Sequence, residues 1–200
     1  MTAGGPVIVD SGGANISSLR FALGRLGCAA PLTDDPALIK AASHVFLPGV
    51  GAAAQAMDRL ESAGLADLMR GLSQPVLGIC LGMQLLFESS EEDGGRECLG
   101  VVPGSVRRLQ GAPDRPVPHM GWNLTSLDTG CPLFEALPAA THFYFVHSYA
   151  APTGTDTVAV ADYGGEFTAM VSRANFHGAQ FHPERSGPAG ARVLANFLAL

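Results

Sequence analysis

Residues Gly78 to Gly82 have the form G-x-nucleophile-x-G, with Cys80 at the centre. The segment follows a short apolar run, Pro75 to Ile79, and precedes helical residues that continue through Phe87. A nucleophile on such a strand-to-helix turn sits on a sharp, strained bend, and glycines two residues away avoid Cβ clashes. The N-terminus of the next helix favours the thiolate, the form of cysteine that attacks. The pattern predicts a nucleophilic Cys80; a small, inert, buried cysteine is the alternative.

A thiolate nucleophile needs a group that moves protons, and His182 is the candidate because Glu184 follows two residues later. In an extended segment, residues i and i+2 point to the same side, and Pro183 restricts the backbone between them. Glu184 would then hold the imidazole tautomer and stabilise its cation. Thiol acyl transfer requires such a Cys–His–acid set. The alternative is an exposed His and Glu at a helix entry.

The segment Pro48 to Gly51 contains two glycines directly after the apolar run Val45 to Leu47. Acyl transfer from an amide builds negative charge on the carbonyl oxygen, which preorganised N–H groups stabilise. Glycines allow a peptide plane either to face a pocket or to turn away from it. A plain strand-to-helix turn explains these glycines equally well.

The stretches Gly78 to Gln84 and Phe181 to Glu184 resemble class I glutamine amidotransferases, the group with a Cys–His–Glu triad. Pro118 to Asn123 and Tyr144 to Tyr149 look like the glutaminase subunits of imidazole glycerol phosphate synthase, and the resemblance covers essentially the whole chain. It implies that Cys80 attacks L-glutamine, that His182 acts first as base and then as acid, and that Glu184 orients it. It also implies a heterodimer with a cyclase subunit, which receives the ammonia in histidine biosynthesis, and no cofactor.

The resemblance assigns further residues around this triad. It implies that the N–H groups of Val50 and Leu81 are the oxyanion donors. The residues expected to hold the substrate are Gly49, Gly51, Gln84, His147, Ser148 and Tyr149. The residues expected at the partner interface are Asn15, His119, Met120 and Trp122. Without the family, Gln84 could face solvent, His147 could be a core histidine, and Trp122 could be either an exposed anchor or a core residue.

One segment, Ser11 to Asn15, departs from the family pattern because it lacks the usual aromatic residue. The departure affects the expected partner contact at that edge and leaves the triad untouched. Three other functions remain open: a subunit serving a different synthase, a freestanding thiol hydrolase such as a γ-glutamyl peptidase, and a binding module with a vestigial site. The intact triad argues against the binding module, and dependence on a partner would separate the other two.

Composition excludes several classes of protein. The 200 residues are 47% apolar and 15% charged, which excludes a disordered chain and favours one domain over residues 1–200. The net charge of −6 and the single lysine, Lys40, argue against nucleic-acid binding. No apolar run reaches the roughly 18 residues of a membrane span. The first basic residue is Arg20, so the start of the sequence lacks the basic region that opens a signal peptide.

The cysteines and histidines indicate the compartment and the absence of a metal site. The cysteines show no CxxC spacing, which favours reduced thiols and a cytoplasmic protein; they are Cys28, Cys80, Cys98 and Cys131. No histidine or cysteine spacing is typical of a metal site, so none is expected.

Strand and helix signals alternate through the first 90 residues, which favours parallel strands joined by crossover helices. In that half, Asn15 can cap a helix that Gly27 ends. The second half contains short strand-like runs and a closing helix from about Ser186. The sequence therefore predicts a single α/β domain, with a mixed, mostly parallel central sheet flanked by helices and an added antiparallel section in the second half. The polar stretch Glu91 to Glu97 is expected to be a mobile surface loop.

Overall fold

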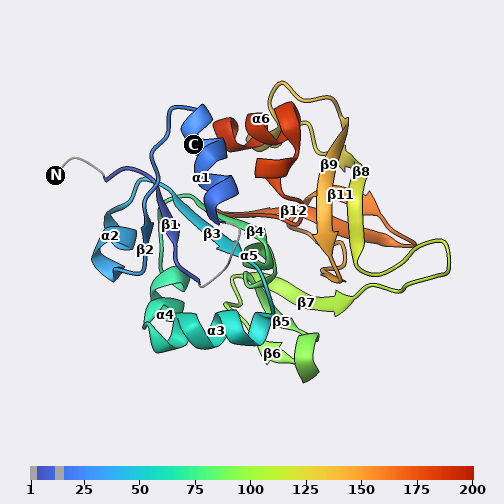
Figure 1. Ribbon diagram of the computed structural model, residues 1–200, viewed down its shortest axis with the longest axis horizontal. Helices are drawn as coiled ribbons and strands as arrows, with labels where there is room; N and C mark the ends of the chain where they lie inside the picture. The colour runs from blue at the N-terminus through green and yellow to red at the C-terminus, as the bar shows by residue number, and fades with distance from the viewer. Residues whose placement is uncertain (1–3, 12–15) are drawn as a thin grey trace.

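The computed structural model describes residues 4–11 and 16–200, and its largest element is one mixed sheet (Figure 1). In spatial order its strands are β2 (Leu32–Thr33), β1 (Val7–Val9), β3 (Val45–Gly49), β4 (Val76–Cys80), β13 (Phe176–Ala179), β12 (Glu166–Arg173), β11 (Thr157–Asp162), β8 (His119–Leu127) and β9 (Ala140–His147). A smaller sheet has the order β10 (Tyr149–Ala150), β7 (Val102–Arg108), β5 (Phe87–Ser90) and β6 (Arg96–Glu97).

The pairing changes direction at β13. From β2 to β13 the neighbouring strands are parallel, and from β13 to β9 they are antiparallel. The expected α/β fold with a mixed sheet is confirmed. The antiparallel section continues the same sheet, and among the described strands of this large sheet the parallel and antiparallel pairings are equal in number.

Two hydrophobic cores lie on opposite faces of the sheet because successive strand side chains alternate in direction. In β1, Val7 and Val9 enter one core and Ile8 the other. The first core packs against α2 (Pro36–Ala41), α3 (Ala53–Ser62) and α4 (Leu65–Arg70), and the second against α1 (Ile16–Arg25) and α6 (Gly187–Leu198). Figure 1 shows α1 and α6 on one side of the sheet and α3 and α4 on the other.

The ends of α1 and α6 follow from local chemistry. Gly27 ends α1 with φ of 75°, and the N–H of Cys28 donates back to the Leu23 carbonyl at 3.0 Å, as in a left-handed helix cap. Pro188 lies in the first turn of α6, where no backbone N–H is needed. Both boundaries match the sequence prediction, and Leu26 is exposed beyond the end of α1. The proposed Asn15 cap lies outside the described residues.

The helix after Cys80 is much shorter than expected. It spans Leu81–Gln84 (α5), and Phe87 begins strand β5 instead of ending a helix. The carbonyls of Leu85 and Leu86 accept hydrogen bonds from Leu99 and Val101, so the chain pairs with the smaller sheet. Phe87 then pairs with Val102 of β7, so the chain continues as a strand and not as a helix.

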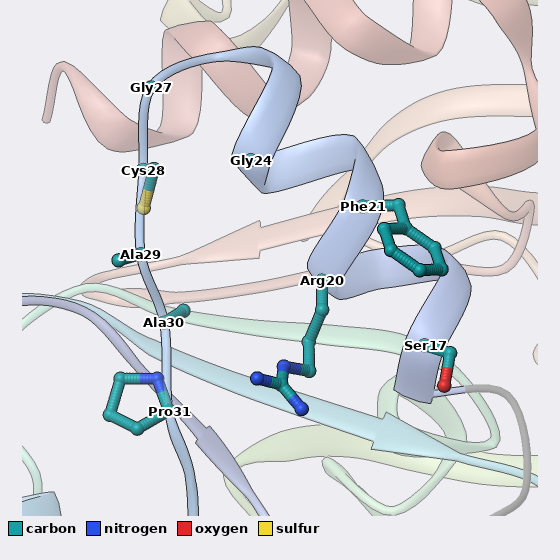
Figure 2. A pocket seen from close by; sticks show the side chains of 9 residues that line it. All are labelled: Ser17, Arg20, Phe21, Gly24, Gly27, Cys28, Ala29, Ala30 and Pro31. Carbon is teal, nitrogen blue, oxygen red and sulfur yellow. The ribbon is translucent and has the colours of Figure 1, made fainter.

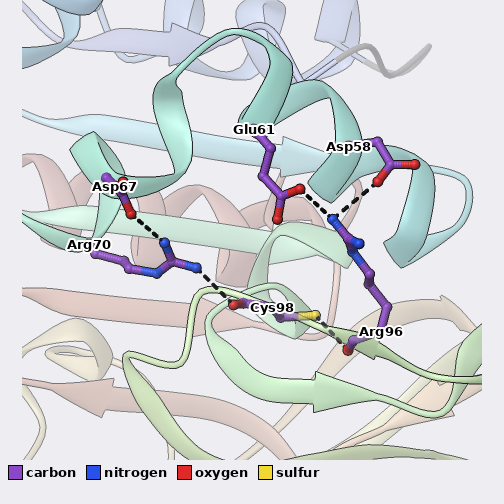
Figure 3. A network of polar contacts seen from close by, with 6 residues as sticks. All are labelled: Asp58, Glu61, Asp67, Arg70, Arg96 and Cys98. Carbon is purple, nitrogen blue, oxygen red and sulfur yellow. Dashed lines mark hydrogen bonds and ion pairs between the residues drawn. The ribbon is translucent and has the colours of Figure 1, made fainter.

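The polar stretch after β5 is not a plain loop. It contains a 3₁₀ turn, η1 (Glu92–Gly94), and then β6. The guanidinium of Arg96 forms ion pairs with Asp58 at 3.1 Å and with Glu61 at 2.6 Å, both on α3 (Figure 3). These contacts, which the sequence did not reveal, attach the stretch to the helix layer.

Candidate active site

Three adjacent parallel strands bring the expected catalytic groups to one edge of the large sheet. Gly49 at the end of β3 pairs with Cys80 at the end of β4, and β13 pairs with β4 on its other side. His182 follows β13 after two residues. Ligands of open α/β sheets bind at the carboxyl ends of the strands, so this edge is the expected place for a site.

The bend at Cys80 depends on the glycines on both sides. Cys80 has φ of 54° and ψ of −110°, a strained conformation for a residue with a side chain. A Cβ on Gly82 would overlap the Leu47 carbonyl oxygen, and one on Gly78 would lie 2.6 Å from the Gly82 carbonyl oxygen. A side chain at either position would therefore cause the clash that the sequence pattern predicted. Only glycine allows α5 to approach β3 and β4 this closely.

His182 and Glu184 form a buried pair. Their side chains are 5% and 3% exposed, and His182 Nδ1 lies 2.8 Å from Glu184 Oε1. Burial lowers the pKa of His182, but its interactions with Cys80 and Glu184 outweigh the burial and raise the pKa to about 10. An imidazolium beside the sulfur is the arrangement that stabilises a thiolate nucleophile.

A cavity of about 460 Å³ opens over Cys80. The predicted residues along its wall are Gly49, Val50, Gly51, Cys80, Leu81, Gln84, His147, Ser148, Tyr149 and His182. Four further residues that the sequence analysis did not select also line it: Glu92, Pro118, Val146 and Arg185. The cavity therefore offers a nucleophile, an acid–base group, a carboxylate and a guanidinium in one space.

The backbone around the cavity is held by polar contacts. Ser11 Oγ donates to the Pro48 carbonyl at 2.7 Å, directly before Gly49. Gln84 is buried, and its amide nitrogen donates to the Tyr149 carbonyl at 2.8 Å. Gln84 therefore lies at the cavity wall and does not face bulk solvent.

His147 and His119 form a buried pair beneath the same wall. Ring nitrogens of the two residues lie 3.0 Å apart, and His147 Nδ1 donates to the Tyr149 carbonyl at 2.9 Å. Burial lowers the pKa of His147 to about 3 and that of His119 to about 4, so both rings are neutral at pH 7. His119 is 3% exposed, so its side chain lies on the inward side of β8, and its expected place at the partner interface stays a prediction.

The other expected interface residues are exposed. Met120 is 63% and Trp122 is 56% exposed, and Leu124 continues the apolar row along the outward face of β8. The alternative of a core tryptophan is therefore wrong. An apolar row of this kind on a surface is typical of a protein–protein contact. Asn15 lies outside the described residues.

A second hollow lies elsewhere in the described chain. It measures about 650 Å³ and is bounded by α1 and the segment Gly27 to Pro31, with Arg20, Phe21 and Cys28 around it (Figure 2). Burial raises the pKa of the Cys28 thiol, which keeps it protonated. The hollow shares no lining residue with the cavity over Cys80.

The described residues lack two further kinds of feature. No cluster of three or more His, Cys, Asp or Glu side chains lies together as a metal site would require. No helix in that part of the chain is long and apolar enough to cross a membrane.

Comparison with known proteins identifies relatives over the full length. Residues 7–200 match the family described as glutamine amidotransferase class-I. Imidazole glycerol phosphate synthase subunit HisH of Vibrio cholerae is 50% identical over 199 residues, which cover 97% of this chain and 98% of that relative. The protein of the same name from Xanthomonas axonopodis pv. citri is 53% identical over 191 residues, which cover 96% of this chain and 95% of that relative.

Solved structures share the fold at low sequence identity. A structure described as a glutamine amidotransferase has a TM-score of 0.74 and 19% identity, covering 97% of each chain. The structure described as PurLQS from Thermotoga maritima has a TM-score of 0.70 and 19% identity, covering 99% of each chain. At these identities the likeness concerns the fold alone.

Proposed function

Because this chain belongs to the class-I glutamine amidotransferase family, we propose that it hydrolyses L-glutamine through Cys80, His182 and Glu184 as the glutaminase subunit of imidazole glycerol phosphate synthase. The ammonia passes to a cyclase subunit in histidine biosynthesis. The observation that carries the proposal is the buried pair of His182 and Glu184 beside Cys80, at the edge of a cavity, in a chain about half identical to relatives of that name.

The reaction follows from the charges of the three groups. The Cys80 thiolate attacks the carboxamide carbon, and the peptide N–H groups of Val50 and Leu81 stabilise the oxyanion. His182 gives its proton to the departing nitrogen, so the C–N bond breaks, ammonia leaves and a γ-glutamyl thioester remains. His182 then takes a proton from water, which attacks the thioester and releases glutamate and the thiolate. Glu184 keeps the imidazole oriented through both steps.

Two charged side chains at the cavity wall suit the amino-acid end of glutamine. Glu92 can bind the α-ammonium group, and Arg185 can bind the α-carboxylate. The Glu92 carboxylate also accepts a hydrogen bond from the Ala53 N–H at 2.7 Å, which fixes its position. Burial raises the pKa of Glu92, which indicates a partly desolvated carboxylate suited to a cationic partner.

Replacing Glu92 by glutamine is expected to raise the KM for glutamine about 10-fold with little change in kcat, because one charge-assisted contact is lost from substrate binding. Steady-state glutaminase assays of the complex measure both constants. Glu91→Gln is the matched control, since Glu91 is exposed and its Oε1 lies 3.8 Å from Nε of Arg107. An unchanged KM for Glu92→Gln would remove Glu92 from the substrate site.

Diazo-oxo-norleucine, a glutamine mimic with an electrophilic carbon, is expected to label Cys80 alone. Burial raises the pKa of Cys98 to about 11 and also raises the pKa values of Cys28 and Cys131, so these three stay as thiols. Mass-spectrometric peptide mapping locates the adduct. Cys131→Ser should label like the unaltered chain, and a main adduct on any cysteine other than Cys80 would refute the assignment.

The partner and the location of the reaction are part of the proposal. The exposed row of Met120, Trp122 and Leu124 is proposed as the cyclase-facing surface, since apolar and aromatic residues are typical of interface centres. Four unpaired cysteines suit a reducing compartment, which supports a cytoplasmic location.

One assay separates the remaining functions. Glutamine hydrolysis is measured for this chain alone, with the cyclase, and with the cyclase and its nucleotide ligand. The proposal requires hydrolysis to depend on the cyclase. A freestanding thiol hydrolase would be fully active alone, and a vestigial binding module would be inactive in all three conditions.

A further inference from the structure

Gln180 is a fully buried polar residue beneath the cavity, outside the set of residues that line it. It follows β13, its exposed fraction is 0%, and its backbone N–H donates to the Ala169 carbonyl at 2.9 Å. Its side-chain nitrogen Nε2 lies 3.8 Å from Cys80 Sγ in hydrogen-bonding geometry. Its Oε1 accepts a hydrogen bond from Gln84 Nε2 at 3.0 Å. The side chain thus bridges the nucleophile and a residue of the cavity wall.

The polarity of this bridge is set at both ends. A thiolate can only accept hydrogen bonds, so the Gln180 amide must present nitrogen to the sulfur and oxygen to Gln84. Gln84 Nε2 then uses one N–H on Gln180 and the other on the Tyr149 carbonyl. The polar atom that Gln84 has left for the cavity is its carbonyl oxygen, an acceptor. The Tyr149 carbonyl and Gln180 Oε1, both acceptors, therefore together set which hydrogen-bonding group Gln84 offers to a substrate.

The sulfur has neighbours of opposite polarity. In the thiol form it can donate to the Val146 carbonyl, 3.7 Å away. In the thiolate form that carbonyl repels the sulfur, and the Gln180 N–H attracts it. The Gln180 contact therefore favours the charged form that attacks, whereas the Val146 carbonyl dipole disfavours it.

We propose that Gln180 is a positioning residue for the glutaminase reaction: it stabilises the Cys80 thiolate from below the cavity and, together with the Tyr149 carbonyl, holds the Gln84 amide in one orientation. The first role affects the nucleophile, and the second affects substrate binding. The effect on turnover rests on the proposed function, whereas the contact with the sulfur does not.

The test uses two variants and two rates. Gln180→Met keeps the side-chain length but loses both hydrogen bonds, and Gln180→Glu keeps the acceptor toward Gln84 but loses the donor to the sulfur. The first rate is glutamine hydrolysis by the complex with the cyclase. The second is alkylation of Cys80 by iodoacetamide at neutral pH, in which the thiolate displaces iodide, so the rate reports how much thiolate is present.

Both variants should slow alkylation of Cys80 and lower kcat about 10-fold or more, as expected for a lost hydrogen bond to a charged group. The KM for glutamine should rise in Gln180→Met and stay near the unaltered value in Gln180→Glu, because only the second keeps both acceptors that hold the Gln84 amide. Gln74→Met is the matched control: it removes an amide that donates to the Ile39 carbonyl at 2.9 Å, far from the site, and should change neither rate.

Each outcome has a separate meaning. Alkylation and kcat at unaltered levels in a folded Gln180→Met would overturn the proposal. If that variant does not fold, Gln180→Glu tests the sulfur contact by the same two rates, and unaltered rates there would also overturn it. If the unaltered complex fails to hydrolyse glutamine, the proposed function fails, while a slower alkylation in the Gln180 variants would still support the contact with the sulfur.

Discussion

Cys80→Ala is expected to lower glutamine-dependent synthesis by the complex with the cyclase by at least about 10⁴-fold, as removal of the nucleophile does in other triad enzymes. The alanine variant has no group that can form the γ-glutamyl thioester, and among the described residues no other thiol lines the cavity. Synthesis from added ammonium salt should be unchanged, because that reaction takes place on the cyclase chain. The measurement is product formation with glutamine and with ammonium as alternative nitrogen sources.

The paired assay also controls for folding and assembly. Ammonia-dependent synthesis at the unaltered rate, together with co-purification of the two chains, shows that the variant still docks. Cys98→Ala removes a different buried thiol and should keep both activities. Normal glutamine turnover by purified Cys80→Ala would disprove the thioester mechanism.

Gly82→Ala is expected to destabilise the fold by about 3 kcal/mol or more and to remove glutaminase activity. The added methyl would overlap the Leu47 carbonyl oxygen, which belongs to the backbone of β3 and cannot turn aside as a side chain can. Relief of the clash requires α5 to move away from β3, and that movement shifts Cys80, the residue two positions earlier. Chemical denaturation gives the free energy of unfolding, and the glutaminase assay gives the activity.

A second glycine provides the matched comparison. Gly24 lies in α1 with helical φ, and a Cβ there meets no atom within 4 Å. Gly24→Ala should therefore leave activity unchanged and raise stability by up to about 1 kcal/mol, since alanine is the better helix former. If Gly82→Ala were as stable as Gly24→Ala, the close approach of α5 to β3 would not be required.

The sequence was most informative where one residue type alone satisfies the geometry. Gly78 and Gly82 were predictable from a steric rule about the turn at Cys80, and the structure shows the close backbone approaches that the rule requires. The strands β11 and β12 were predictable as short strand-like runs between turn residues. These features depend on neighbours in the sequence, which is why a single chain reveals them.

The sequence was least informative where position depends on distant contacts. Leu85 to Phe87 form an apolar run that suits a helix or a strand, and pairing with Val102 selects the strand. Glu92 lies among surface-like polar residues, and only the fold places it at the cavity wall. Gln180 precedes His182 by two residues, yet nothing local indicates that its amide reaches the sulfur.

The directions of the side chains along β8 could have been predicted from the sequence. Met120, Trp122 and Leu124 alternate along β8, which places their side chains on the outward face of the strand. Because strand side chains alternate, His119 must point inward, where it contacts His147. The period of two was present in the sequence, and it separates the three exposed residues from His119, which lies under the cavity wall.

The parallel pairing of β4 with β13 has a consequence for how such chains can diverge. Cys80 and Gln180 are 100 positions apart in the chain, yet adjacent strands hold their segments about 4.8 Å apart. Insertions or deletions in the intervening chain leave the spacing between nucleophile and base unchanged, as long as these two strands still pair. That intervening chain supplies Glu92 to the cavity wall and the exposed row on β8. Changes there can alter the cavity wall and the exposed row while Cys80 and His182 keep their positions relative to each other.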